Sequence, residues 1–302
     1  MKYKTRTLVS FDKISVTLQI EDSYKLKLKD KLLEGLETYK EKGRIAKHYF
    51  NQERYGNVFR FEIPTDTHEG RFVLKILIYP LHKSHNFFKI EFNPNKLGSK
   101  GGRKILRIMK IILGAKKAGR IYSKGRITRI DLAIDVYQHI NCFMLVKGAV
   151  KSRIIVSKSG EIESQIAGSK ASNSHTTLYN KVVEQANLNR KCGHEVWYRL
   201  EIVMRKLGIS IAEIPENLPN YFKKISFYRT TLLDDDYFDQ GFLALVRTYG
   251  LNTALHTLDR NTRASYFRQL DEYKYEPFNL RKLSITQGVE SLSFLDPENL
   301  LE

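Results

Sequence analysis

The sequence predicts an α+β fold in which an antiparallel sheet with flanking helices is followed by a small helical C-terminal domain. Three observations predict it. Segments rich in β-branched and aromatic residues occupy 57–92, an amphipathic pattern follows at 104–117, and short helical patterns occupy the chain after about residue 231. Strands and helices mixed in this way are typical of α+β proteins. The hydrophobic share of 42% in 302 residues is large enough for a packed core.

The first strands are expected where apolar and polar residues partly alternate. These are NVFRFEI at 57–63, RFVLKILIYP at 71–80 and FFKIEF at 87–92. The segment NPNKLG at 93–98 breaks the pattern. From 104 to 117, isoleucine, leucine and methionine recur at helical spacing between lysines and arginines, which predicts a basic amphipathic helix.

Three more extended segments are expected further along the chain. ITRIDLAIDVY starts at Ile127, HTTLYNK starts at His175 and WYRLEIVMR starts at Trp197. The C-terminal part is expected to contain helices over 242–249, 251–258 and 263–273, with Gly250 as a stop between the first two.

The charge changes sign near residue 231. Residues 231–302 hold 7 Lys+Arg and 12 Asp+Glu, a net charge of −5, so the remaining 44 Lys+Arg and 21 Asp+Glu give residues 1–230 a net charge of +23. We therefore expect one domain over 1–230 and a second, helical domain over 231–302.

The overall composition favours a polyanionic partner. The net charge is +18 and the isoelectric point about 9.7, which favours nucleic acid over an anionic membrane surface. The sequence has no uncharged run of about 18 residues and no signal-peptide core, so we expect no membrane partner and a location in the cytoplasm. Cys142 and Cys192 are expected to be reduced thiols.

Two carboxylates are expected on one face of the strand that starts at Ile127. The period of two along ITRIDLAIDVY aligns Arg129, Asp131 and Asp135. The two acids fit a hard cation such as Mg²⁺ or Mn²⁺, which prefers oxygen ligands. The alternative is a half-buried strand whose acids pair with neighbouring arginines.

A third carboxylate follows in WYRLEIVMR, where Arg199 and Glu201 share a strand face. Glu201 is a further candidate oxygen ligand, and Arg129 and Arg199 are candidate DNA contacts. The alternative is again a strand acid held in a salt bridge.

A candidate nucleophile lies between these acids. In SHTTLYNK, an extended backbone aligns His175, Thr177, Tyr179 and Lys181 on one face. Attack on a phosphodiester needs an oxygen nucleophile, and a neighbouring cation stabilises both the phenolate and the charge on phosphorus. His175 is a candidate for metal or DNA contact, or an ordinary hydrogen-bonding residue. Tyr179 is one of 17 tyrosines, most of which are expected to pack in the core.

The C-terminal helices carry a second set of candidate DNA contacts. Arg260, Arg263 and Arg268 are placed to meet phosphates or base edges, as in a helix-turn-helix. The alternative is a helical packing or oligomerisation domain, which would fit a homodimer.

The ordered set of segments resembles the gene II/X family of phage and plasmid replication proteins. KIEFNPNKLG, ITRIDLAIDVY, TTLYNK, VWYRLEIVMRKLG and the terminal helices occur in the family's order over 87–273, and plasmid rolling-circle initiators share a similar order. The resemblance implies an origin-specific, metal-dependent nicking enzyme that forms a 5′-phosphotyrosine, leaves a free 3′-hydroxyl and later rejoins the displaced strand.

Carried onto this sequence, the resemblance makes Tyr179 the nucleophile and Lys181 its basic companion. Asp131 and Glu201 become metal ligands for Mg²⁺ or Mn²⁺, with Asp135 as a third acid. The implied partners are origin DNA, host helicase, single-strand-binding protein and DNA polymerase.

Two other functions fit the charge. One is an origin-binding initiator or repressor that does not cut DNA, and the other is a protein that coats nucleic acid without sequence preference. Neither explains why the acids and the tyrosine follow the order found in nickases.

Overall fold

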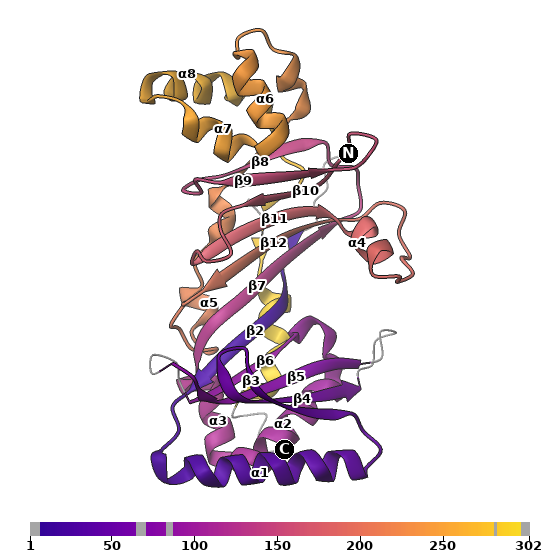
Figure 1. The fold of residues 1–302 in the computed structure, drawn as a ribbon, viewed down its shortest axis with the longest axis vertical. Helices are drawn as coiled ribbons and strands as arrows, with labels where there is room; N and C mark the ends of the chain where they lie inside the picture. Colours follow the sequence, from indigo (N-terminus) through magenta and orange to yellow (C-terminus); the bar gives the residue numbers. More distant parts are fainter. Residues whose placement is uncertain (1–6, 65–70, 83–86, 281–282, 297–302) are drawn as a thin grey trace. The chain divides into compact units, whose positions relative to one another are not determined.

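The computed structural model describes residues 7–64, 71–82, 87–280 and 283–296 (Figure 1). It divides into two compact units. Unit 1 comprises residues 1–8, 133–204 and 219–284, and unit 2 comprises 9–132, 205–218 and 285–302. Ten strands follow one another in the hydrogen-bonded order β3-β4-β5-β6-β2-β7-β12-β11-β10-β9.

Strand β7 contributes its first residues to unit 2 and its last to unit 1. The other elements of unit 2 are β2 (Ser10–Leu18), α1 (Asp22–Glu41), β3 (Ala46–Gln52), β4 (Tyr55–Pro64), β5 (Arg71–Pro80), β6 (Phe88–Phe92), η1 (Pro94–Lys96), α2 (Gly98–Leu113), α3 (Ala115–Lys124), α5 (Ile214–Asn217), α9 (Thr286–Glu290) and η6 (Ser293–Leu295).

Unit 1 holds the remaining elements. They are β1 (Thr7–Leu8), the end of β7 (Arg126–Val136), β8 (Cys142–Val146), β9 (Ser152–Val156), β10 (Ile162–Ala167), β11 (Ser174–Asn180), α4 (Lys181–Asn187), β12 (Tyr198–Arg205), η2 (Tyr221–Lys224), β13 (Ile225–Arg229), η3 (Thr230–Asp234), α6 (Gln240–Tyr249), α7 (Leu251–Thr257), α8 (Arg260–Leu270), η4 (Asp271–Tyr273), β14 (Lys274–Tyr275) and β15 (Leu283–Ser284).

In unit 2, helices α1, α2 and α3 lie on one side of the strands β3 to β6 (Figure 1). Leu28, Leu32 and Leu36 are the buried stripe of α1, at the helical spacing that places them on one face. The pairs β3–β4, β4–β5, β5–β6 and β2–β6 are all antiparallel. The three strands predicted over 57–92 are therefore confirmed.

A buried carboxylate strengthens this sheet. Glu91 accepts a hydrogen bond from Ser15 and forms ion pairs with Lys13 and Lys89 at 3.1 and 2.6 Å. Burial alone would raise the pKa of Glu91, but the two lysines outweigh it and hold the pKa at about 2.

The basic helix predicted over 104–117 is two helices. Gly114 has a φ of 78°, a conformation that favours glycine, and its N–H closes α2 by donating to the carbonyl of Lys110. The apolar residues at helical spacing, Ile105 to Leu113, all lie in α2, and the predicted range extended past Gly114 into the start of α3. The strand β2, helix α1 and strand β3 lie in the first part of the chain, where the sequence offered no motif.

In unit 1, a second sheet of three strands in the order β14-β13-β8 accompanies the strands β12-β11-β10-β9. The buried side chain of Gln165 on β10 joins the two sheets because it accepts from the N–H of Met144 and donates to the carbonyl of Cys142. Helices α6 and α7 pack beside β8 and β9 (Figure 1). Asn252 and Thr253 of α7 bond to the backbones of Val146 and Ser152.

The predicted α+β class, with an antiparallel sheet, flanking helices and C-terminal helices, is confirmed. The third C-terminal helix starts at Arg260, three residues earlier than 263, because Asp259 caps it by accepting from the N–H groups of Asn261 and Thr262. The boundary predicted at residue 231 stays a prediction. The structure groups α6, α7 and α8 with β8 to β13 in unit 1.

Candidate functional site

The candidate nucleophile lies on a central strand of unit 1. Tyr179 on β11 pairs with Arg199 on β12, and Thr177 pairs with Glu201. Residues directly opposite each other in an antiparallel pair project to the same face, so these four side chains share one face of the sheet. The sequence predicted this grouping within each strand, and the register now brings the two strands together.

The hydroxyl of Tyr179 has a carboxylate on one side and an ammonium on the other. It donates to Oε2 of Glu201 at 3.5 Å and accepts from Nζ of Lys181 at 3.4 Å. The ammonium also lies 5.4 Å from the centroid of the Tyr179 ring. A proton acceptor and a positive charge therefore both reach the one oxygen that would attack phosphorus.

Lys181 does not continue the strand as predicted. It is the first residue of α4, because the side chain of Asn180 accepts from the N–H groups of Val182 and Val183 and starts the helix there. The helical turn brings Glu184 onto the ammonium of Lys181, in an ion pair whose lysine side chain is 13% exposed. Glu184, which the sequence analysis did not single out, thereby fixes the cation beside Tyr179.

Asp135 is held by two neighbours. Arg199 forms a two-pronged ion pair with its carboxylate, at 2.8 Å from Nε and 2.7 Å from Nη2. The indole N–H of Trp197 donates to the same carboxylate at 2.6 Å. Planar forks of this kind are among the strongest and most directional ion pairs in proteins.

Asp131, in unit 2, is paired in the same way. Nε and Nη2 of Arg129 each lie 2.7 Å from one of its oxygens. Arg205 is a second neighbour: its burial and the charge of Arg129 lower the pKa of Arg205, while Asp131 raises it. The arrangement is the one expected of strand acids that pair with arginines.

These pairs bear on the predicted metal ligands. Arginine forks engage both oxygens of Asp131 and of Asp135, and Glu201 faces the Tyr179 hydroxyl. Within the described part of the chain, no three His, Cys, Asp or Glu side chains cluster in a way that could hold a metal ion. The assignment of Asp131, Asp135 and Glu201 as ligands for magnesium or manganese therefore stays a prediction.

The remaining predicted contacts fall into two groups. His175 lies on β11, half-buried and opposite Val203. In α8, Arg260 and Arg268 are exposed, whereas Nη2 of Arg263 donates to the carbonyls of His256 and Leu258 at the end of α7. Arg263 therefore joins two helices. DNA contact by these three arginines, and by Arg129, Arg199 and His175, stays a prediction.

Beside the candidate nucleophile lies a group of aromatic side chains that the sequence did not predict. Tyr137, His194 and Trp197 contact one another with ring centroids 4.3 to 6.0 Å apart, and we call them the aromatic cluster. Lys181 lies 5.9 Å from the Trp197 ring centroid. Burial and then the charge of Asp135 raise the pKa of Tyr137, which makes Tyr137 a poorer source of phenolate.

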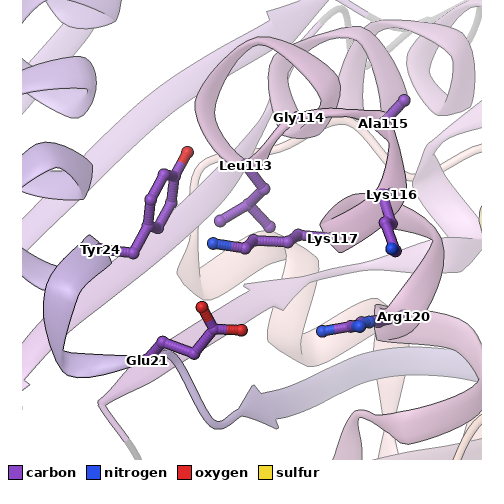
Figure 2. Close-up of a pocket in the computed structure, with 8 residues that line it drawn as sticks. All are labelled: Glu21, Tyr24, Leu113, Gly114, Ala115, Lys116, Lys117 and Arg120. Atoms are coloured by element: carbon purple, nitrogen blue, oxygen red, sulfur yellow. The ribbon is translucent and has the colours of Figure 1, made fainter.

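Unit 2 contains a separate basic pocket with a volume of about 400 Å³ (Figure 2). Lys116, Lys117 and Arg120 of α3 line it together with Glu21 and Tyr24. Figure 2 shows Lys117 pointing toward the Tyr24 ring, and its Nζ lies 3.5 Å from the ring centroid. Three cations against one carboxylate give the pocket a net positive charge.

The described residues include no helix that is long and apolar enough to cross a membrane. No protein-family model matches the chain, and no curated protein matches it. One solved structure to which it is similar is described as "Structure of Rolling Circle Replication Initiator Protein from Geobacillus stearothermophilus". The alignment has 16% identity, covers 80% of this chain and 97% of that one, and has a TM-score of 0.39. At this TM-score the similarity establishes neither fold nor function.

Proposed function

We propose that this protein is a DNA-nicking enzyme that starts rolling-circle replication, with Tyr179 as its nucleophile. The observation that carries the proposal is the position of the Tyr179 hydroxyl, between the carboxylate of Glu201 and the ammonium of Lys181. A tyrosine packed only for structure does not need a proton acceptor and a cation on the same oxygen.

The contacts suggest a role for each side chain. Glu201 accepts the phenolic proton, and the phenolate oxygen attacks the phosphorus of one DNA strand. The new O–P bond replaces the bond to the 3′ oxygen, which leaves as a free 3′-hydroxyl after taking up a proton. Lys181 stabilises the phenolate and the extra negative charge on the phosphate, while Glu184 holds the lysine in place.

Binding of the DNA is assigned to the basic part of the chain. Residues 1–230 carry the positive net charge, and the pocket formed by Lys116, Lys117 and Arg120 offers one place for a backbone phosphate. Phosphate contacts position a protein on DNA without reading its sequence. Recognition of an origin is assigned to other surfaces, with the exposed Arg260 and Arg268 of α8 as candidates.

The 5′-phosphotyrosine preserves the energy of the broken bond. A polymerase extends the free 3′-hydroxyl, and after one circuit the new 3′-hydroxyl attacks the phosphotyrosine, which restores Tyr179 and closes a single-stranded circle. This sequence of events uses a host helicase, single-strand-binding protein and polymerase. We also propose that the reaction requires Mg²⁺ or Mn²⁺.

A nicking assay tests the proposal. The purified protein is incubated with supercoiled origin DNA in Mg²⁺ or Mn²⁺, and open circles and covalent protein–DNA adducts are measured. Tyr179→Phe should abolish both products and leave DNA binding unchanged. The matched control is Tyr249→Phe, because Tyr249 is an exposed tyrosine at the end of α6, outside the strands β11 and β12 that carry the site.

The assay also separates the rival functions. An origin-binding protein that does not cut yields neither open circles nor adduct in the unaltered chain. Nicking that survives in Tyr179→Phe overturns the choice of nucleophile. If Asp131→Asn and Glu201→Gln nick normally with an unchanged requirement for metal, the predicted ligands are wrong.

A further inference from the structure

The aromatic cluster is built on the surface and not in the core. Tyr137 is 57% exposed, and His194 is also exposed. The rings of Tyr137 and His194 are 4.3 Å apart at 38°, and those of Tyr137 and Trp197 are 6.0 Å apart at 33°. The cluster therefore presents aromatic surface to solvent, which burial of apolar area does not explain.

The cluster has a rigid base. The indole N–H of Trp197 is bonded to Asp135, and the same carboxylate is gripped by the fork of Arg199. The guanidinium of Arg199 also lies over the Trp197 ring, 5.6 Å from its centroid. One hydrogen bond and one cation over the ring therefore hold Trp197 in position, and the rings of Tyr137 and His194 that contact it are ordered before a ligand binds.

The cluster adjoins the candidate nucleophile. The ammonium of Lys181 lies 5.4 Å from the ring centroid of Tyr179 and 5.9 Å from that of Trp197. One cation thus borders both the attacking oxygen and the aromatic surface. A DNA strand with a phosphate beside Tyr179 and Lys181 would therefore bring a neighbouring nucleotide toward the rings.

We propose that the aromatic cluster is a stacking site for an unpaired base of single-stranded DNA, next to the phosphate that Tyr179 attacks. Rigid aromatic faces beside cations are the surfaces on which single-stranded nucleic acids stack their bases. Stacking requires an unpaired base, so the site selects a melted strand over a duplex. This inference rests on the proposed function for its location, but the stacking itself can be measured without any cutting.

Trp197 makes the measurement direct, since it is the only tryptophan in the chain. The full-length Tyr179→Phe protein, which cannot form the adduct, is titrated with an oligothymidylate of about 12 nucleotides, a length within the usual site sizes of single-strand binders. A matched oligomer of abasic deoxyribose phosphates has the same charge and no bases. Trp197 fluorescence reports stacking, and anisotropy of a labelled oligomer reports affinity.

We expect the oligothymidylate to quench Trp197 and to bind roughly tenfold more tightly than the abasic oligomer, the contribution of about one stacked base. Tyr137→Ala should remove most of this preference, and Tyr137→Phe should keep it. Tyr249→Ala, which removes an exposed tyrosine from α6, should leave both affinities unchanged.

Equal affinity for the two oligomers, or an undiminished preference in Tyr137→Ala, overturns the stacking site. The outcome does not depend on nicking. If the unaltered protein prefers bases in this way but fails to nick origin DNA, the proposed function is wrong and the stacking site stands. If the protein nicks origin DNA but shows no preference for bases, the stacking site is wrong and the proposed function stands.

Discussion

Removing the ammonium beside Tyr179 should slow nicking by an amount that the structure allows us to work out. At 3.4 Å between Lys181 Nζ and the Tyr179 oxygen, the attraction between an ammonium and a phenolate is about 5 kcal/mol at an effective dielectric constant of about 20. The carboxylate of Glu184 contacts the same ammonium and offsets part of this attraction. We take about 1–3 kcal/mol as the net effect, which is a roughly fivefold to 150-fold slower reaction in Lys181→Met.

The assay is single-turnover nicking of supercoiled origin DNA over a range of pH. Without the cation, less phenolate forms at a given pH, so Lys181→Met should require more alkaline solution to reach a given rate. Lys181→Arg keeps the charge and should retain most of the rate, while binding of uncut DNA should be similar in all three proteins. A Lys181→Met protein that nicks at the unaltered rate with the same pH profile refutes the role given to this lysine.

Three further predictions concern stability and DNA binding. The pKa of Glu91 is about 2 against an ordinary 4.5, so its ion pairs contribute about 3 kcal/mol to the free energy of unfolding. This contribution is complete above pH 4.5 and is lost as the pH falls toward 2. Glu91→Gln should remove this pH dependence in denaturant titrations, and an unchanged dependence on pH contradicts the prediction. Arg263→Met should cost about 1–2 kcal/mol in thermal unfolding, because two carbonyls at the end of α7 lose their donor, and a null effect excludes that role. Replacing Lys116, Lys117 and Arg120 with alanine should weaken DNA binding and lower its salt dependence, whereas an unchanged salt slope means that the pocket meets no phosphate.

Much of the fold could be predicted because several strands carry a strong local pattern. β-branched and aromatic residues alternate with polar ones at 57–63 and 71–80, and both segments are strands. The strands β9 and β10 lack this alternation with polar residues over a long segment. Their sequences, SRIIV and IESQIA, are short and mixed, and their pairing with each other and with β11 decides their structure.

In the site, too, features set by neighbouring residues could be predicted, whereas contacts between residues far apart in the sequence could not. The period of two correctly placed Arg199 and Glu201 on one face of a strand, and the register of β11 against β12 confirms that Tyr179 shares this face. The sequence did not reveal that Lys181 begins a helix, although Asn180 is a common helix cap. It also did not reveal the aromatic cluster, because Tyr137 and Trp197 are far apart along the chain and meet only through the fold.

The sequence pattern is compatible with two roles for the acids. The pattern allowed either metal ligands or partners for arginine, and Asp131 and Asp135 both form arginine forks in the structure. Spacing along a strand predicts which side chains share a face, but it does not predict which charged side chain or ion will contact them. The pairs with Arg129 and Arg199 are observed, and metal binding by the same acids stays a prediction.

The most direct test of the central claim is to identify the residue that carries the DNA. The unaltered protein is incubated with a single-stranded origin oligonucleotide, the adduct is digested with nuclease and protease, and the modified peptide is sequenced by mass spectrometry. We predict a 5′-linked nucleotide on Tyr179, in the peptide that contains TTLYNK, and no adduct in Tyr179→Phe. A nucleotide attached to any other residue, or origin cleavage that leaves no covalent link, contradicts the account.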